Sequence, residues 1–207
     1  MNKKNSNAGF TLVELMIAVA LFTIIVAIAI GGFTNALRTQ RQVSSLIATQ
    51  SNISLALEQM TREIRTGYLF CHDVDVNTPN GKCGTCIISS PPSALTWTCS
   101  ALDYYTADGT HVNYSMVSGG LIRTVIDDTT GLSTPNSITG DNVNVQKLKF
   151  VLFGNLEGDN WNPRITLSIG VSPSSTDIAT MNDIIYLQTS VSARQIDCTS
   201  ISGTLQC

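Results

Sequence analysis

The feature that most constrains this chain is an apolar run from Phe10 to Phe33, in which Glu14 is the only charged residue. A helix of roughly 24 residues is about 36 Å long, and the hydrocarbon core of a bilayer is about 30 Å thick. Lys3 and Lys4 precede the run, and positive charge beside the first apolar segment favours a cytoplasmic N-terminus. The sequence therefore predicts a single-pass membrane anchor with the rest of the chain exported.

Three ordinary explanations of the run compete. Ala27-Ile28-Ala29 fits the cleavage pattern of a secretory signal peptide, but the run is longer than the usual apolar region of about 7–15 residues and contains an acid. A plain signal anchor does not explain Glu14, because a carboxylate at membrane depth costs about 2.5–3.5 kcal/mol on insertion scales. A buried helix of a soluble protein is disfavoured by the near absence of polar residues from Leu15 to Ile30.

The motif Gly9-Phe10-Thr11-Leu12-Val13-Glu14-Leu15 resembles the prepilin peptidase signature of type IV pilins and of type II secretion pseudopilins. The resemblance implies cleavage after Gly9 on the cytoplasmic face and N-methylation of Phe10 as the new N-terminus. It also implies that Glu14 neutralises the Phe10 amine of a neighbouring subunit. The implied partners are prepilin peptidase, the inner-membrane assembly platform, membrane lipid before assembly, and other pilins or pseudopilins that pack through the N-terminal helix.

The physical chemistry of a buried carboxylate is consistent with that implication, because a buried charge is tolerated when it is paired. Cleavage after Gly9 would create an ammonium at Phe10, one helical turn from Glu14. That ammonium could pair with Glu14 of the same chain or of an adjacent helix. The pair between chains would also set the stagger between subunits.

We expect four regions: a cytoplasmic leader at residues 1–9, a transmembrane and assembly helix at 10–33, an amphipathic helix at 34–67, and a disulfide-stapled β-rich head at 68–207. The precursor would lie in the inner membrane, and the mature subunit in a periplasmic or extracellular filament. Gly31 and Gly32 each weaken a helix by about 1 kcal/mol relative to alanine, so we expect a bend there or a stretch that melts on filament assembly. Alternatively, the two glycines permit close helix packing.

Residues 34–66 show helical periodicity. The C-terminal half of the apolar stripe should pack on a sheet, and the N-terminal half should be available to neighbouring subunits. The stripe contains Val43, Leu46, Ile47, Ile53, Leu57, Met60 and Ile64. The opposite, polar face contains Arg38, Gln40, Arg41, Gln42, Glu58, Gln59, Arg62, Glu63 and Arg65.

After Gly67 the period changes to two, which predicts strands. Residues 127–142 are polar and turn-rich, and we expect no strand there. The segment 143–153 alternates with a slip near Lys147. Strands are expected at 68–75, 86–90, 94–99, 102–107, 111–117, 121–126, 143–153, 164–171 and 184–193. The predicted fold class is α+β, with a long helix packed on an antiparallel β-sheet head, as in pilins.

Six cysteines lie after the apolar run, and an even number on the exported side favours disulfides. A hairpin would place Cys86 opposite Cys99. Cys71–Cys83 and Cys198–Cys207 would then be the other pairs. A zinc site or a redox-active pair at Cys83-Gly-Thr-Cys86 is the alternative, although the chain lacks the second close pair that a zinc ribbon needs.

Catalytic motifs are absent from the sequence, and we expect no enzymatic activity and no catalytic residue. We expect no cofactor, with calcium as the alternative: Asp73-Val-Asp75-Val-Asn77 has oxygen ligands at alternating positions, and Asp127-Asp128 is a second acidic pair. Charged residues make up 13% of the chain and the net charge is −3, so the head is not expected to bind nucleic acid.

The resemblance is strong over residues 9–66 and weaker beyond them. Asn113–Arg123, Leu148–Phe150 and Thr189–Arg194 are similar to the larger minor pseudopilins of the J type and minor pilins of the W type. The resulting hypothesis is a structural minor subunit that primes assembly or sits at the filament tip. The alternative is a membrane-anchored exported binding domain that does not polymerise.

Overall fold

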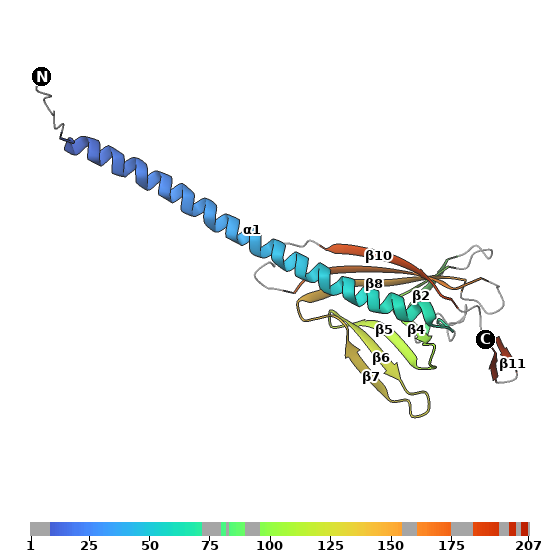
Figure 1. The fold of residues 1–207 in the computed structure, drawn as a ribbon. Helices are drawn as coiled ribbons and strands as arrows, with labels where there is room; N and C mark the ends of the chain where they lie inside the picture. Colours follow the sequence, from blue (N-terminus) through green and yellow to red (C-terminus); the bar gives the residue numbers. More distant parts are fainter. Residues whose placement is uncertain are drawn as a thin grey trace, which may run out of the picture. The chain divides into compact units, whose positions relative to one another are not determined.

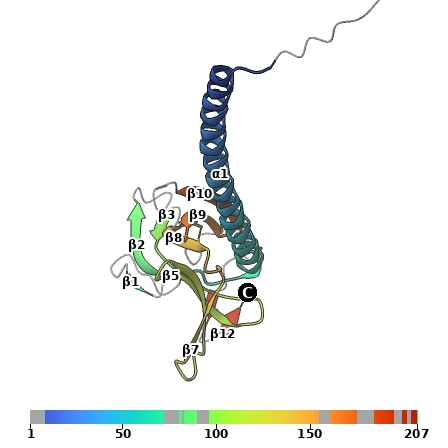
Figure 2. The ribbon, with the colours of Figure 1, turned by 90° about the vertical axis from the view of Figure 1, so that its left-hand side faces the viewer.

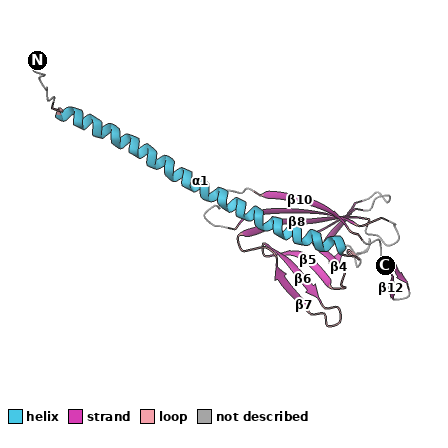
Figure 3. Cartoon of the chain, in the orientation of Figure 1, coloured by secondary structure: helices cyan, strands magenta, loops and turns pink. Residues whose placement is uncertain are grey.

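The computed structural model describes residues 9–71, 80–81, 83–89, 96–154, 161–174, 184–194, 199–201 and 204–206. The chain divides into two compact units, Met1–Ser44 and Ser45–Cys207. One helix, α1 (Leu12–Thr66), begins in the first unit and ends in the second. Strands make up most of the remaining described chain (Figure 3). The α+β class expected from the sequence, with a long helix packed on antiparallel sheets, is therefore confirmed.

In the first unit, α1 is continuous, and its side chains are exposed with the partial exceptions of Val26 and Gln42. Among the described residues, α1 is the one helix long and apolar enough to cross a membrane, with a mean hydropathy of 2.8 over its most apolar window. The helix passes through Gly31 and Gly32 without a break. A Cβ atom at either glycine would meet no atom within 4 Å. Melting of this stretch on assembly stays a prediction.

In the second unit, α1 packs one face into the core of the head. Ile53, Leu57, Met60 and Ile64 are buried, whereas Ile47 is 62% exposed. The expected division of the apolar stripe is therefore confirmed for its C-terminal half, which packs on the sheets (Figure 1).

The larger sheet has six strands, and every neighbouring pair is antiparallel. The slip expected near Lys147 is present as a register shift between Val145 and Lys147, where β8 pairs with β9. The strands, in spatial order, are β1 (Asn80–Gly81), β2 (Gly84–Ser89), β3 (Thr96–Cys99), β8 (Val143–Phe153), β9 (Arg164–Pro173) and β10 (Ile185–Ser192).

The smaller sheet is a four-stranded antiparallel meander, visible below the C-terminal part of α1 in Figure 1. Its strands are β4 (Leu102–Tyr105), β5 (His111–Val117), β6 (Gly120–Ile126) and β7 (Ser133–Ser137). The expectation of no strand within 127–142 is wrong, because β7 pairs with β6 there. All five β7 residues are exposed and one is Pro135, so this edge strand has no apolar alternation to reveal it.

Two further segments differ from expectation. The strand expected at 68–75 is wrong over its described part: Tyr68 makes one isolated bridge to Tyr105, and Leu69 and Cys71 have positive φ angles of 54° and 52°, which end any extended run. Residues 72–75 lie outside the described residues. Near the C-terminus, β11 (Thr199–Ile201) and β12 (Thr204–Gln206) form an antiparallel pair that we had not expected.

The chain crosses between the two sheets twice, and these crossings join the head into one core. Residues Ser100 and Ala101 separate β3 from β4, and the segment 138–142 returns the chain from β7 to β8. Figure 2 shows β5 of the smaller sheet lying beside β8 of the larger one. Side chains from α1 and from both sheets belong to a single buried cluster.

Candidate functional site

The first site is the start of α1, where Thr11 is the N-cap residue. Thr11 Oγ1 accepts a hydrogen bond from the Glu14 amide at 3.3 Å, and the Thr11 carbonyl accepts one from the Leu15 amide at 3.2 Å. The first bond satisfies an amide that the first helical turn cannot pair internally, and the second is the first i→i−4 bond of the helix. The helix therefore begins just after Phe10, and the Gly9–Phe10 bond lies in exposed, non-helical backbone.

Glu14 is exposed at the third position of α1, inside the apolar segment. A carboxylate in the first turn gains about 0.3–1 kcal/mol from the partial positive charge of the helix N-terminus. Placing a carboxylate at membrane depth costs about 2.5–3.5 kcal/mol. The helix terminus therefore does not offset the cost of this acid, and a cationic partner is needed to account for it.

Residues 4–30 match the family model of the prokaryotic N-terminal methylation motif. The match includes Gly9, Phe10 and Glu14 and supports the type IV pilin and pseudopilin class, which is structural rather than catalytic. The methylation motif and the apolar helix together fit a single-pass membrane anchor. No curated protein and no solved structure matches the chain.

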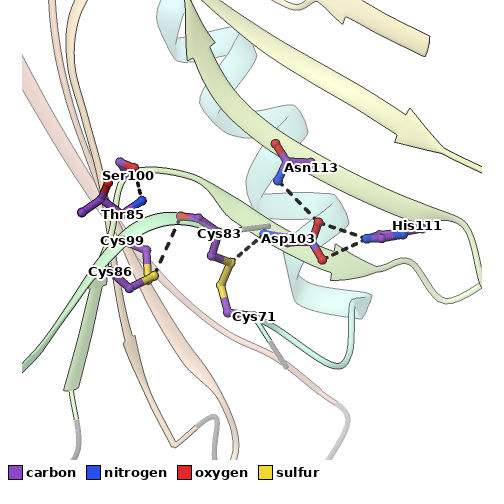
Figure 4. The surroundings of a disulfide bond; sticks show 9 residues. All are labelled: Cys71, Cys83, Thr85, Cys86, Cys99, Ser100, Asp103, His111 and Asn113. Atoms are coloured by element: carbon purple, nitrogen blue, oxygen red, sulfur yellow. Dashed lines mark hydrogen bonds and ion pairs between the residues drawn. A yellow bond between two sulfur atoms is a disulfide. The ribbon is translucent and has the colours of Figure 1, made fainter. Parts of the chain in front are cut away.

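The four described cysteines form two disulfides, Cys71–Cys83 and Cys86–Cys99, with Cα–Cα distances of 5.7 and 4.1 Å. These are the pairs expected for these four cysteines, and Cys198 and Cys207 lie outside the described residues. The bonded sulfurs leave no thiolate at Cys83 or Cys86 for the alternative zinc site. Both disulfides lie beside the first crossing between the sheets (Figure 4), where the Asp103 amide donates to Cys83 Sγ at 3.1 Å.

A second polar cluster joins α1 to the smaller sheet. Glu63 Oε2 accepts hydrogen bonds from Tyr104 at 3.1 Å, Tyr114 at 2.9 Å and Arg123 Nε at 3.0 Å. Burial raises the pKa of the Glu63 carboxyl, but the bonds from Arg123 and the tyrosines outweigh burial, so this pKa lies below its ordinary value. Burial and the nearby carboxylate raise the pKa of both tyrosines. Glu63 is therefore an ionised anchor for three donors.

A third cluster surrounds His111, whose side chain is 1% exposed. His111 Nε2 lies 2.9 Å from Asp103 Oδ1, and Nδ1 lies 2.5 Å from Asp128 Oδ1. The imidazole can donate to both carboxylates only when both of its nitrogens are protonated. Tyr105 stacks on the ring at 4.6 Å and donates to Asp128 Oδ2 at 2.8 Å. Both ring nitrogens are thus engaged within the protein.

Of the two candidate calcium-binding segments, the structure describes only the one at Asp127 and Asp128. Asp73, Asp75 and Asn77 lie outside the described residues. Asp127 Oδ1 accepts hydrogen bonds from the amides of Thr129 and Thr130, and Asp128 pairs with His111. Within the described part of the chain, no group of three or more His, Cys, Asp or Glu residues could hold a metal ion.

Sequence patterns missed both buried polar clusters. Glu63 was placed on the polar face of the helix, which is wrong, because its carboxylate is turned toward the smaller sheet. The sequence offered one signal of this orientation: Glu63 directly precedes Ile64, a residue of the apolar stripe that packs on the sheets. His111 begins a predicted strand, but nothing in the local pattern indicated that carboxylates from β4 and from the turn after β6 would meet it.

Proposed function

We propose that this chain is a minor pilin or pseudopilin, a structural subunit of a type IV pilus-like or type II secretion filament that primes assembly or sits at the tip. The inner-membrane precursor is cleaved after Gly9, Phe10 is N-methylated, and the head is exported. The observation that supports this proposal is a lone carboxylate, Glu14, in the first turn of an apolar helix that follows an exposed, non-helical Gly9–Phe10 bond.

The position of Glu14 gives the proposal its mechanism. Cleavage after Gly9 leaves an ammonium at Phe10, beside the end of the helix where Glu14 lies. Helices packed side by side bring the Glu14 of one chain to the amine of the next, which removes most of the cost of a carboxylate in the membrane. Assembly then depends on charge at both positions, and only a processed chain has the amine.

Substitution of Glu14 tests the assembly role. We expect Glu14→Gln to keep membrane insertion and processing but to reduce filament incorporation at least tenfold, measured by recovery in sheared filament fractions. Glu58→Gln is the matched control, because it makes the same chemical change at an exposed i, i+4 pair with Arg62. Normal incorporation of Glu14→Gln would contradict the assembly role of Glu14, and absence of the native chain from the filament fractions would favour the alternative, an anchored domain that does not polymerise.

Mass spectrometry of the mature protein tests processing directly. The expected N-terminus is methylated Phe10, and Gly9→Val should leave the precursor uncleaved, because a branched side chain is added beside the scissile bond. A mature chain that begins at Met1, or one trimmed beyond Ala29, would contradict the proposal.

A further inference from the structure

The two sheets of the head differ in charge. No strand of the six-stranded sheet contains Asp or Glu, although the whole chain has a net charge of −3. Three exposed cations lie on this sheet: Lys147 and Lys149 on β8 and Arg164 on β9. The sheet is therefore cationic in a chain that is acidic overall.

These cations share the outer face of the sheet. The residues next to them along the strands, such as Phe150 and Ile165, are buried in the core, so the alternating positions point outward. Lys149, Ser168 and Gln188 form one cross-strand row, and Lys147, Gly170 and Tyr186 form the adjacent row. Within the described strands, this outer face has no carboxylate to neutralise the lysines.

Lys147 is held in place on this face. Its Nζ lies 5.6 Å from the centroid of the Tyr186 ring, within range of a cation–π interaction. A Cβ atom at Gly170, between them in the row, would lie 3.1 Å from Tyr186 Cε1 and 3.3 Å from Lys147 Cβ. The absent side chain thus lets the lysine and the tyrosine pack across the strand, which leaves the cation ordered and exposed.

The smaller sheet has the complementary charge at one end. The turn between β4 and β5 contains Asp108, and the turn after β6 contains Asp127; in a meander these two turns lie at the same end. Hydrogen bonds from Thr106 and Thr110 lower the pKa of Asp108, and bonds from the Thr129 and Thr130 amides lower the pKa of Asp127. Both exposed carboxylates therefore stay ionised.

We propose that the outer face of the six-stranded sheet is a docking surface for a second copy of this chain, which presents the turns of Asp108 and Asp127 to Lys147, Lys149 and Arg164. The two surfaces are different patches, so the contact is heterologous and can join copies of a minor subunit side by side in the complex that starts a filament. The inference rests on the proposed function, because assembly brings the copies together, and it adds a contact between heads.

Charge complementarity favours a second copy over other anionic partners. Each chain contains both the cationic face and an ionised acidic end, so the partner is always present at the concentration of the subunit. Three cations can neutralise at most three phosphates, whereas strong binding to nucleic acid uses about 6–10 phosphate contacts. A small acidic patch matches the surface better than a polyanion does.

Photo-crosslinking in cells tests the docking surface with the full chain. A photoreactive residue replaces the exposed Gln188, which lies in the row of Lys149, and cross-linked peptides are identified from a mixture of isotopically labelled and unlabelled copies. We expect cross-links between copies, from position 188 to residues 106–110 or 127–132. Lys147→Glu with Lys149→Glu should reduce them at least tenfold, and Lys147→Arg with Lys149→Arg should retain them.

Reciprocal variants keep the test decisive if one of them folds poorly. Asp108→Asn with Asp127→Asn keeps one acceptor oxygen in each turn, removes both charges and should also reduce the cross-links. A copy with both lysines changed to glutamate should regain them when mixed with a copy with both aspartates changed to lysine. Cross-links only to nucleic acid, to polysaccharide or to another protein, or a yield that charge reversal leaves unchanged, would overturn the inference.

Measuring filament incorporation and cross-linking in the same cells distinguishes failure of this inference from failure of the proposed function. A processed chain whose incorporation requires Glu14 but whose cross-links ignore the lysines would overturn only the docking surface. Charge-dependent cross-links in a chain that incorporates normally without Glu14 would uphold the docking surface and contradict the filament mechanism.

Discussion

At the scale of single residues, Glu63 has the largest set of partners that join α1 to the smaller sheet. One carboxylate oxygen accepts from two tyrosines and an arginine, and the Glu63 side chain is only 26% exposed. Removing a charged acceptor leaves its donors in a partly buried site, where a lost hydrogen bond to a charged group costs more than a neutral one. This residue should therefore matter more for stability than the exposed ion pairs of the same helix.

We expect Glu63→Gln to lower the free energy of unfolding by about 2–3 kcal/mol. Urea unfolding of the full chain in detergent micelles, followed by the fluorescence of the buried Trp97, measures the change. Glu58→Gln, which removes an exposed pair with Arg62, should change the stability by less than about 0.5 kcal/mol. Equal effects of the two substitutions would show that the contacts of Glu63 do not stabilise the head.

The lowered pKa of Glu63 also predicts a pH dependence. Because the folded-state pKa lies below the ordinary value of 4.5, the stabilising contribution of Glu63 is fully present well above pH 4.5. It is lost as the pH falls through the folded-state pKa. Urea unfolding at a series of pH values below about 5 should show a steeper loss of stability in the native chain than in Glu63→Gln. Parallel pH profiles would contradict this.

At the scale of elements, α1 combines two kinds of helix in one uninterrupted segment. Its first part has exposed apolar side chains, and its last part has a buried stripe from Ile53 to Ile64. Gly31 and Gly32 lie in the first part and contact nothing that would exclude a side chain. Close packing within the described chain therefore does not explain why glycine occupies these two positions. Two explanations remain: the glycines lower the stability of the helix, or they allow another chain to pack closely against it.

We expect Gly31→Ala with Gly32→Ala to strengthen α1 by about 1 kcal/mol per position and to raise its resistance to thermal unfolding in micelles, measured by circular dichroism. If assembly melts this stretch, the same variant should form fewer filaments. Ala36→Gly, the reverse change about one turn further on, is the control and should weaken the helix. Normal filament yield from a stabilised helix would contradict the melting hypothesis.

At the scale of the whole head, one disulfide joins β2 to β3 within the six-stranded sheet, and the other joins the segment after α1 to the turn between β1 and β2. The Cys71–Cys83 and Cys86–Cys99 bonds have sequence separations of 12 and 13 residues. Closing loops of this length restricts the unfolded chain and stabilises the folded state by about 3 kcal/mol each. We therefore expect the head to reach its full stability in an oxidising compartment.

Removing the Cys86–Cys99 bond by serine at both positions should lower the free energy of unfolding by about 3 kcal/mol. Urea unfolding of the oxidised chain gives the measurement. Removal of Cys71–Cys83 in the same way should cost nearly as much, because the loops are almost equal in length. If each removal lowered the free energy of unfolding by less than about 1 kcal/mol, loop closure would not be how these disulfides stabilise the head.

Much of the fold could be predicted from local pattern. The apolar run identifies the first part of α1, the alternation of 143–153 predicts β8, and even the register shift near Lys147 is visible as a slip in that alternation. Each of these signals depends on a residue and its neighbours within a few positions. β7 lacks such a signal, because its five exposed residues include Pro135 and it joins the sheet through backbone pairing with β6.

Local sequence alone predicts the motif around Gly9 and Glu14, the long helix and most strands. Helical and extended periodicities, and a single charge in an apolar run, are properties of residues that are close together in the sequence. The partners of Glu63, the two carboxylates at His111 and the cationic outer face come from residues far apart in the chain. Lys149 and Gln188 become neighbours only through β9. Such contacts are decided by strand order and register in the folded head, since these place distant residues within reach of one another.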